Sequence, residues 1–177
     1  MVNDCFFCQV YSDKVGIIYE NKHFYSRFDR YPVAPGHAEV IPKRHIVSLR
    51  DLAKTEWNDL LSSLEEIVNI IESYPLKYFY KELSTEAEYV DRSFEWSGLL
   101  MKNFGDDKSR EYARQMLTHV GIGKKPDGYN IGINEGEAAG RTVNHLHVHV
   151  IPRYLGDVED PRGGVRYVIP KLANYKK

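Results

Sequence analysis

The stretch that decides the fold of this chain is Val143-Asn144-His145-Leu146-His147-Val148-His149-Val150-Ile151-Pro152. Side chains alternate between the two faces of a β-strand, so a strand here would place the histidines on one face and the apolar residues on the other. A row of imidazoles adds nothing to a hydrophobic core, whereas histidine is a nucleophile, a base or a metal ligand near neutral pH. The pattern therefore predicts a strand with one reactive face and one core face.

The three histidines allow two chemical interpretations. In the first, His147 attacks an electrophilic centre while His145 and His149 fix its tautomer and donate protons. In the second, the His-x-His spacing supplies zinc ligands and leaves one coordination position open for water. The residues that precede the histidines distinguish between these interpretations.

The segment before the strand favours the first interpretation. Residues 134–142 contain Gly136 and Gly140, and backbone N–H groups among such small residues can approach an anion closely. Arg141 adds a guanidinium suited to phosphate, and Thr142 adds a hydroxyl. A phosphate-binding turn next to three imidazoles points to attack at phosphorus.

Four other segments are rich in β-branched or aromatic residues and predict strands. They are residues 16–20, 23–28, 37–41 and 129–134. An apolar rhythm of helical period predicts a long helix with Thr55 as N-cap and Pro75 as stop. The rhythm comprises Trp57, Leu60, Leu61, Leu64, Ile67, Val68 and Ile71, and we expect these side chains in the core.

Residues 76–126 are aromatic and charged, with one helix predicted over residues 106–120 and ended by Gly121. We interpret this segment as a helical surface insertion; a cap over a site or an oligomer interface is the alternative. A length of 177 residues fits a single domain with a sizeable core, which we expect to span residues 1–177.

Charge and hydropathy argue against two kinds of partner. The net charge is -1 at pH 7, so no overall basic field would draw nucleic acid or an anionic membrane. The chain contains no run of about 18 apolar residues, and its first five residues lack the basic and apolar regions of a signal peptide. We therefore expect a cytoplasmic protein without nucleic-acid or membrane partners.

Three blocks of the sequence resemble a known family. The run His145-Leu146-His147-Val148-His149-Val150 is similar to the alternation of histidine and apolar residues that defines the histidine triad (HIT) family. Residues 29–45 and 128–140 are similar to two further blocks of that family, and residues 76–126 have no match. HIT proteins are nucleotidyl hydrolases and transferases that act at the α-phosphate of nucleotides.

The resemblance implies a fold and an assembly. The fold is α+β, a five-stranded antiparallel sheet with a long helix packed on one face and the site at strand ends. Family members commonly pair as twofold dimers, so a homodimer is expected. The turn-rich tail at residues 160–166 would then reach the partner's site.

The resemblance also implies roles for the histidines. His147, the middle one, would be the nucleophile and form a covalent nucleotidyl-histidine that water then cleaves. His149 would hydrogen-bond the phosphate and assist the leaving group. His37 would complete the cluster from the neighbouring strand, and His145 is the first member of the triad.

Five further residues are expected to bind the substrate. Asp29 resembles the residue that holds the ribose hydroxyls, and Asn134 and Thr142 occupy positions that contact phosphates. Backbone amides from Gly140 onward would stabilise the charge on the phosphoryl oxygens. Arg141 departs from the glutamine usual in hydrolase-like members; because arginine accepts no hydrogen bond, we expect it to favour a polyphosphate substrate and to slow hydrolysis of the intermediate.

Cys5 and Cys8, the only cysteines, have the spacing of half a zinc site. In a subset of the family two histidines complete such a site, and by position these would be His45 and His145. All four ligands would then come from the protein, so the zinc would be structural. The alternative is a pair of buried thiols with His45 in a solvated loop.

The expected activity is that of a nucleotidyl hydrolase or transferase. Its substrate would be a dinucleoside polyphosphate, such as diadenosine tetraphosphate, or a nucleoside phosphoramidate. No catalytic metal is required in the family, although magnesium would accompany a polyphosphate. Two alternatives stay open: a nucleotide sensor with little turnover, and a zinc hydrolase with three histidine ligands.

Overall fold

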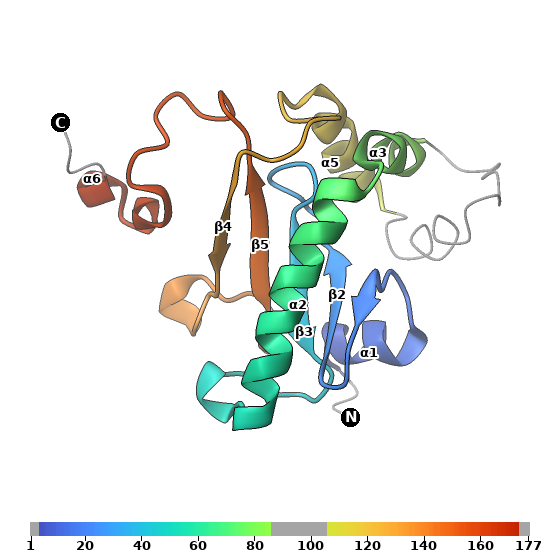
Figure 1. The fold of residues 1–177 in the computed structure, drawn as a ribbon, viewed down its shortest axis with the longest axis vertical. Coiled ribbons are helices and arrows are strands. Elements are labelled where there is room, and N and C mark those ends of the chain that lie inside the picture. The colour runs from blue at the N-terminus through green and yellow to red at the C-terminus, as the bar shows by residue number, and fades with distance from the viewer. Residues whose placement is uncertain (1–3, 86–105, 174–177) are drawn as a thin grey trace.

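The computed structural model describes residues 4–85 and 106–173. Its centre is a five-stranded antiparallel sheet with the strand order β1-β2-β3-β5-β4 (Figure 1). The strands are β1 (Tyr19–Glu20), β2 (Phe24–Phe28), β3 (Ala38–Pro42), β4 (Gly128–Gly132) and β5 (Val148–Arg153). This sheet and its separate helices confirm the predicted α+β class.

The helices surround the sheet. The α-helices are α1 (Phe6–Asp13), α2 (Lys54–Ser73), α3 (Leu76–Ser84), α5 (Asp107–Thr118) and α6 (Pro170–Ala173). Three single-turn 3-10 helices are η1 (Leu49–Asp51), η2 (Glu137–Ala139) and η3 (Gly164–Val168). Helices α3 and α5 fall within the predicted insertion, whose middle, residues 86–105, lies outside the described residues. Across the described ranges no helix has the length and apolar character needed to cross a membrane.

Helix α2 covers one face of the sheet (Figure 1). Its buried side chains Ile67 and Ile71 belong to the main core together with Phe28, Val40 and Val150 of the strands. Helix α1 packs on the opposite face, where the Tyr25 hydroxyl donates a hydrogen bond to the Phe7 carbonyl at 2.7 Å. The second face is therefore closed at one end by α1 and carries polar side chains beyond it.

Two details predicted for α2 were wrong. The N-cap is Ala53, not Thr55, and the first turn is closed by Glu56, whose carboxylate accepts the Ala53 N–H at 2.7 Å. Trp57 and Leu61 were expected in the core but are 41% and 63% exposed. The sheet covers only one stripe of the helix, and the apolar pattern is wider than that stripe.

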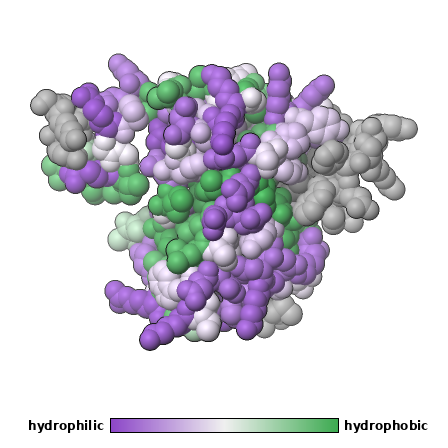
Figure 2. Space-filling view, in the orientation of Figure 1, coloured by the Kyte–Doolittle hydropathy of each residue, from purple (hydrophilic) through white to green (hydrophobic). Residues whose placement is uncertain are grey.

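Exposed apolar side chains are concentrated in part of the surface on the α2 side (Figure 2). On this side α2 presents Trp57 and Leu61, and the edge strand β4 carries Ile131, which is 43% exposed. Apolar surface beside an unpaired strand edge is typical of an interaction surface.

The histidine stretch differs from its prediction. Strand β5 begins only at Val148, because the Leu146 N–H donates to the Ile46 carbonyl and the His145 N–H to the Val143 carbonyl. The inside–outside alternation holds from Val148 onward, with His149 partly exposed between two buried valines. The expectation that one strand face carries all three imidazoles was wrong, since the chain bends before the strand starts.

Candidate functional site

His147 is held in one tautomer. Its Nδ1 lies 2.7 Å from the His145 carbonyl oxygen, which can only accept, so Nδ1 carries the proton and Nε2 keeps its lone pair. The side chain is buried, with its ring 5.1 Å from that of Phe7 and 4.9 Å from that of His149. An imidazole held in this way can act through Nε2 as a nucleophile or a base.

A second cluster adjoins His147 and consists of Asp29, His37 and His149. His37 Nε2 lies 3.1 Å from His149 Nδ1, and the Asp29 carboxyl lies 3.5 Å from His37 Nδ1. Burial, with the neighbouring His37 and His147, lowers the pKa of His149 to about 4. Burial also lowers the pKa of His37. At neutral pH these rings are therefore uncharged and can exchange hydrogen bonds with a ligand.

A tight loop places His37 at the start of β3. Gly36 adopts φ +84°, a backbone conformation that residues other than glycine rarely adopt. Its N–H donates to the Tyr80 hydroxyl of α3 at 3.0 Å, and the Tyr154 hydroxyl donates to the Pro35 carbonyl at 2.9 Å. Two buried tyrosines thus fix the loop that aims His37 at His149.

The glycine-rich turn is closed on itself. Gly136 and Gly140 both have positive φ, and the Gly140 N–H donates to the Glu137 carbonyl at 2.8 Å. The Arg141 N–H donates to the Gly136 carbonyl at 3.2 Å, and its guanidinium donates to the Val47 carbonyl at 2.9 Å. The amides of Gly140 and Arg141, expected to face a phosphate, are engaged inside the turn in this structure.

Two other expected phosphate ligands keep their side chains available. Asn134 is partly buried and Thr142 is exposed. Neither side chain makes a hydrogen bond to any residue in the part of the chain that the structure describes. Both can therefore donate to a ligand without breaking an existing contact.

Four side chains form a separate cluster next to the end of β3 and the start of β5. They are Cys5, Cys8, His45 and His145. Their candidate ligand atoms all lie within 4.8 Å of one another. Cys5 Sγ lies 3.3 Å from His145 Nδ1, and Cys8 Sγ lies 3.5 Å from His45 Nδ1. Both cysteines are buried and neither is in a disulfide, and two thiols with two imidazoles match a tetrahedral structural zinc site. In the alternative, His45 would lie in a solvated loop. In the structure it is partly buried, with its Nδ1 3.5 Å from Cys8 Sγ.

His145 is prepared for such a role. Its Nε2–H donates to the Pro42 carbonyl at 2.9 Å, so Nδ1, the atom that faces the thiols, keeps its lone pair. Burial lowers the pKa of the ring to about 4, and a neutral imidazole is the form that binds metal. The ring of the first triad histidine therefore faces the cysteines, away from the cluster around His149.

Sequence reasoning missed a charged pair, Arg27 and Glu39. The two residues are paired in register between β2 and β3, and Glu39 is also paired with His149 of β5, so all three lie on one sheet face. The Arg27 and Glu39 side chains are only 1% and 10% exposed. The signal that could have revealed this pair is a charged residue in the middle of a strand whose other residues are apolar.

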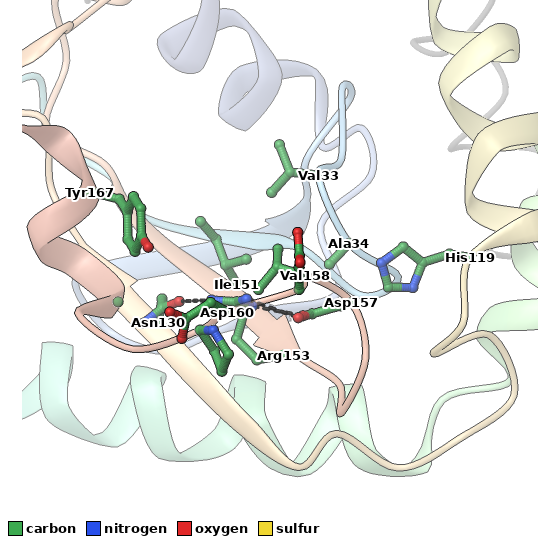
Figure 3. Close-up of a pocket in the computed structure, with 13 residues that line it drawn as sticks. Val33, Ala34, His119, Asn130, Ile151, Arg153, Asp157, Val158, Asp160 and Tyr167 are labelled. Atoms are coloured by element: carbon green, nitrogen blue, oxygen red, sulfur yellow. Dashed lines mark hydrogen bonds and ion pairs between the residues drawn. The ribbon is translucent and has the colours of Figure 1, made fainter. Parts of the chain in front are cut away.

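A cavity of about 550 Å³ lies farther along the same face (Figure 3). Its lining includes Ile151, two residues after His149, and Tyr167 from the C-terminal segment. At its floor Arg153 donates to Asn130 at 2.6 Å and to Asp157 at 2.7 Å. Its volume is in the range of small-molecule sites, and the sequence did not indicate it.

Comparison with known proteins shows the family of the chain. The family model described as "HIT domain" matches residues 12–156. A HIT-like protein of Mycoplasma pneumoniae is 30% identical over 86% of this chain and 73% of its own length. An "AP-4-A phosphorylase" of Mycobacterium tuberculosis is 26% identical over 91% of this chain and 59% of its own. A "Bis(5'-nucleosyl)-tetraphosphatase [asymmetrical]" of Schizosaccharomyces pombe is 29% identical over 73% and 44%, respectively.

Solved structures share the fold. A HIT family protein from Bacillus anthracis superposes with a TM-score of 0.54 at 24% identity, covering 89% of this chain and 78% of that one. A member of the same family from Bacillus subtilis gives a TM-score of 0.53 at 22% identity, covering 87% and 76%.

Proposed function

Because the chain belongs to the HIT domain family, we propose that it is a nucleotidyl hydrolase or transferase in which His147 attacks the α-phosphorus of a nucleotide. The observation that carries the proposal is the 2.7 Å contact between His147 Nδ1 and the His145 carbonyl, which leaves Nε2 as the free nucleophile. The names of several relatives refer to diadenosine or dinucleoside polyphosphates, which supports a substrate of that class.

The proposed reaction has two displacements at phosphorus. His147 Nε2 forms a bond to the α-phosphorus as the bond to the bridging oxygen breaks, and the leaving phosphate keeps the electron pair. Water then attacks the same phosphorus, the N–P bond breaks, and a nucleoside monophosphate and the free imidazole are released. A phosphoramidate would follow the same course, with a proton supplied to the leaving amine.

The neighbours of His147 supply positioning. His149 lies beside it and would hydrogen-bond the phosphoryl oxygens, while His37 orients His149 through the 3.1 Å contact. Asp29 would accept from the ribose hydroxyls. Asn134 and Thr142 would donate to phosphate oxygens.

Gly140 and Arg141 would contribute backbone donors only if the glycine-rich turn rearranges, because their amides already donate within it. The Arg141 guanidinium retains N–H groups beyond the one given to Val47, and these suit a polyphosphate.

We place a structural zinc ion on Cys5, Cys8, His45 and His145. Their donor types, burial and mutual distances fit it, and with four protein ligands it would leave no open position. Bound zinc would tie the N-terminal segment to the backbone that holds His147. Zinc would not take part in the displacement.

A homodimer is proposed from the exposed apolar area near Trp57, Leu61 and Ile131. Strand β4 is one of the two edge strands of the sheet and carries Ile131, so two copies related by a twofold axis can pair their β4 edges and bury this surface. Gel filtration with light scattering should give twice the chain mass, and Leu61→Asp should give the monomer.

The second candidate function is a nucleotide sensor with little turnover. The observation that favours it is the closed turn, in which the amides of Gly140 and Arg141 are already engaged. A zinc hydrolase with three histidine ligands is disfavoured by the geometry, since the His145 ring faces the cysteines and cannot join His147 and His149 around one ion.

One experiment separates these functions. The protein is incubated with diadenosine tetraphosphate and, separately, with adenosine phosphoramidate, with and without a chelator, and products are resolved by chromatography. Covalent catalysis predicts turnover that resists the chelator and is lost in His147→Ala. Tight binding without product would indicate the sensor. Turnover of the phosphoramidate abolished by the chelator, in protein that keeps the melting temperature of the untreated chain, would overturn the proposed mechanism.

A further inference from the structure

Arg27 and Glu39 form a buried charged pair that the proposed reaction does not use. The Arg27 Nε atom lies 3.9 Å from the Glu39 carboxyl, and both side chains are at least nine-tenths buried. Removing two charges from water is costly, and an apolar pair of similar volume would stabilise a fold as well or better. Stability alone therefore does not explain why these charges stand on this face.

The Glu39 carboxyl is short of hydrogen-bond donors. Besides the 3.9 Å contact with Arg27, it accepts no hydrogen bond from any residue in the ranges 4–85 and 106–173. Burial raises the pKa of Glu39 to about 8, as expected for a carboxyl removed from water without donors. A buried polar group left in this state is prepared to accept N–H groups from a ligand.

The pair lies where the base of a nucleotide would be. The phosphate would lie at His147 and His149, and the ribose at Asp29. Arg27 and Glu39 occupy the same face directly next to these residues: Glu39 is opposite His149 in register, and Arg27 is two residues before Asp29 on β2. A nucleotide bound by phosphate and ribose at those residues can extend its base toward this pair.

An aromatic ring completes the subsite. The guanidinium carbon of Arg27 lies 5.3 Å from the centre of the Phe6 ring of α1. Phe6 is 37% exposed, so its ring is accessible from solvent. Aromatic rings stack on nucleobases irrespective of their identity, which leaves the choice of base to the polar pair.

We propose that Glu39 and Arg27 read the edge of the nucleobase and select guanine over adenine. Guanine presents two adjacent donors, N1–H and the N2 amino group, which together can hydrogen-bond both oxygens of the ionised Glu39 carboxyl and so favour loss of the proton that burial retains on it. The guanine O6 accepts from a guanidinium. Adenine has no N1–H and no O6, so it offers neither the donor pair to Glu39 nor an O6 acceptor to Arg27. This inference rests on the proposed function, because that function places the phosphate and ribose.

The test measures binding of GMP and AMP by calorimetry, which needs no turnover. The wild type should bind GMP at least about tenfold more tightly than AMP, the size expected for one paired edge contact. Glu39→Gln should lose that preference, since its amide NH₂ opposes the N2 amino group of guanine and can pair with adenine. Glu20→Gln, in the surface pair with Lys14 and Lys43, is the matched control and should keep the preference.

A second variant guards against a folding defect. Arg27→Met with Glu39→Leu removes both charges at similar volume, so it should fold and bind GMP and AMP equally. Equal binding of GMP and AMP by the wild type, or binding of neither, would overturn the inference, while turnover lost in His147→Ala would still support the proposed function. A guanine preference together with undiminished turnover in His147→Ala would support base selection and contradict the proposed nucleophile.

Discussion

His145 holds His147 with its backbone while its own ring faces the other way. The His145 carbonyl oxygen lies 2.7 Å from His147 Nδ1, and the His145 ring Nδ1 lies 3.3 Å from Cys5 Sγ. One residue thus belongs to both clusters. A change in the cysteine cluster is expected to reach the proposed nucleophile through this single backbone group.

The first prediction concerns a covalent adduct on His147. Quenching the reaction with base during turnover should preserve an N–P bond, and mass spectrometry should find a nucleoside monophosphate on the peptide that contains His147. His147→Ala should carry no adduct. His23→Ala is the control, because His23 pairs with Asp59 outside the site, and it should be labelled like the wild type.

The second prediction links zinc to stability and activity. Protein purified under reducing conditions should contain one zinc per chain, and Cys8→Ser should lose it together with several kcal/mol of unfolding free energy. Because His145 connects the two clusters, kcat should also fall about tenfold, the effect expected when the His147 ring is slightly displaced from its position. A zinc-free wild type with the same melting temperature as Cys8→Ser would refute the site.

The third prediction follows from the lowered pKa of His149. The folded ring has a pKa of about 4 against an ordinary 6.5, so between these values the unfolded chain binds a proton that the folded chain does not. This contribution is fully present above pH 6.5 and is lost as the pH falls toward 4, roughly 2 kcal/mol between pH 7 and 5. Urea titrations at the two pH values measure it.

The pH titration has its own control. His149→Asn should show a flatter decrease in stability than the wild type between pH 7 and 5. An identical slope for wild type and His149→Asn would show that this ring does not cause the dependence.

The fourth prediction concerns Arg141. If its positive charge retains the nucleotidyl-histidine intermediate, wild-type protein should show a burst of product followed by a slower steady rate. Arg141→Gln should show no burst, because glutamine can accept a hydrogen bond from the attacking water. Rapid-quench kinetics measure both phases, and equal turnover by the two proteins would remove the hypothesis.

The fifth prediction concerns the loop before His37. In Gly36→Ala the new Cβ would lie 2.9 Å from an Ile71 methyl group, at a φ of +84° that disfavours alanine. We expect a loss of about 1–3 kcal/mol in unfolding free energy. We also expect a decrease in kcat, because His37 moves with the loop. Gly123→Ala is the control, since its φ is +74° but its new Cβ would meet nothing within 4 Å.

Local patterns were sufficient for most elements. The strands, the long helix and the helix expected within residues 106–120 follow from alternation and helical period, which act over a few residues. The Cys-x-x-Cys pair could also be read directly from the chain, whereas the α+β class was implied by the family resemblance. The grouping of Cys5, Cys8, His45 and His145 was available only through the family resemblance, and the structure brings these four together.

Tertiary contacts decided the rest. A hydrogen bond from Leu146 to Ile46 bends the chain before β5, so the three histidines divide between two clusters instead of sharing one strand face. The sheet covers only part of the apolar stripe on α2, which leaves Trp57 and Leu61 exposed.

The sequence by itself determined which histidines and cysteines can do chemistry, because this depends on residue type and short spacing. It also determined the segments that become the strands, α2 and α5, but it did not predict α1 or α3. Only the tertiary structure decided that Arg27 and Glu39 lie beside His149, and that the amides of Gly140 and Arg141 are already engaged. Strand register and turn closure arise from contacts between distant parts of the chain, and no local pattern contains them.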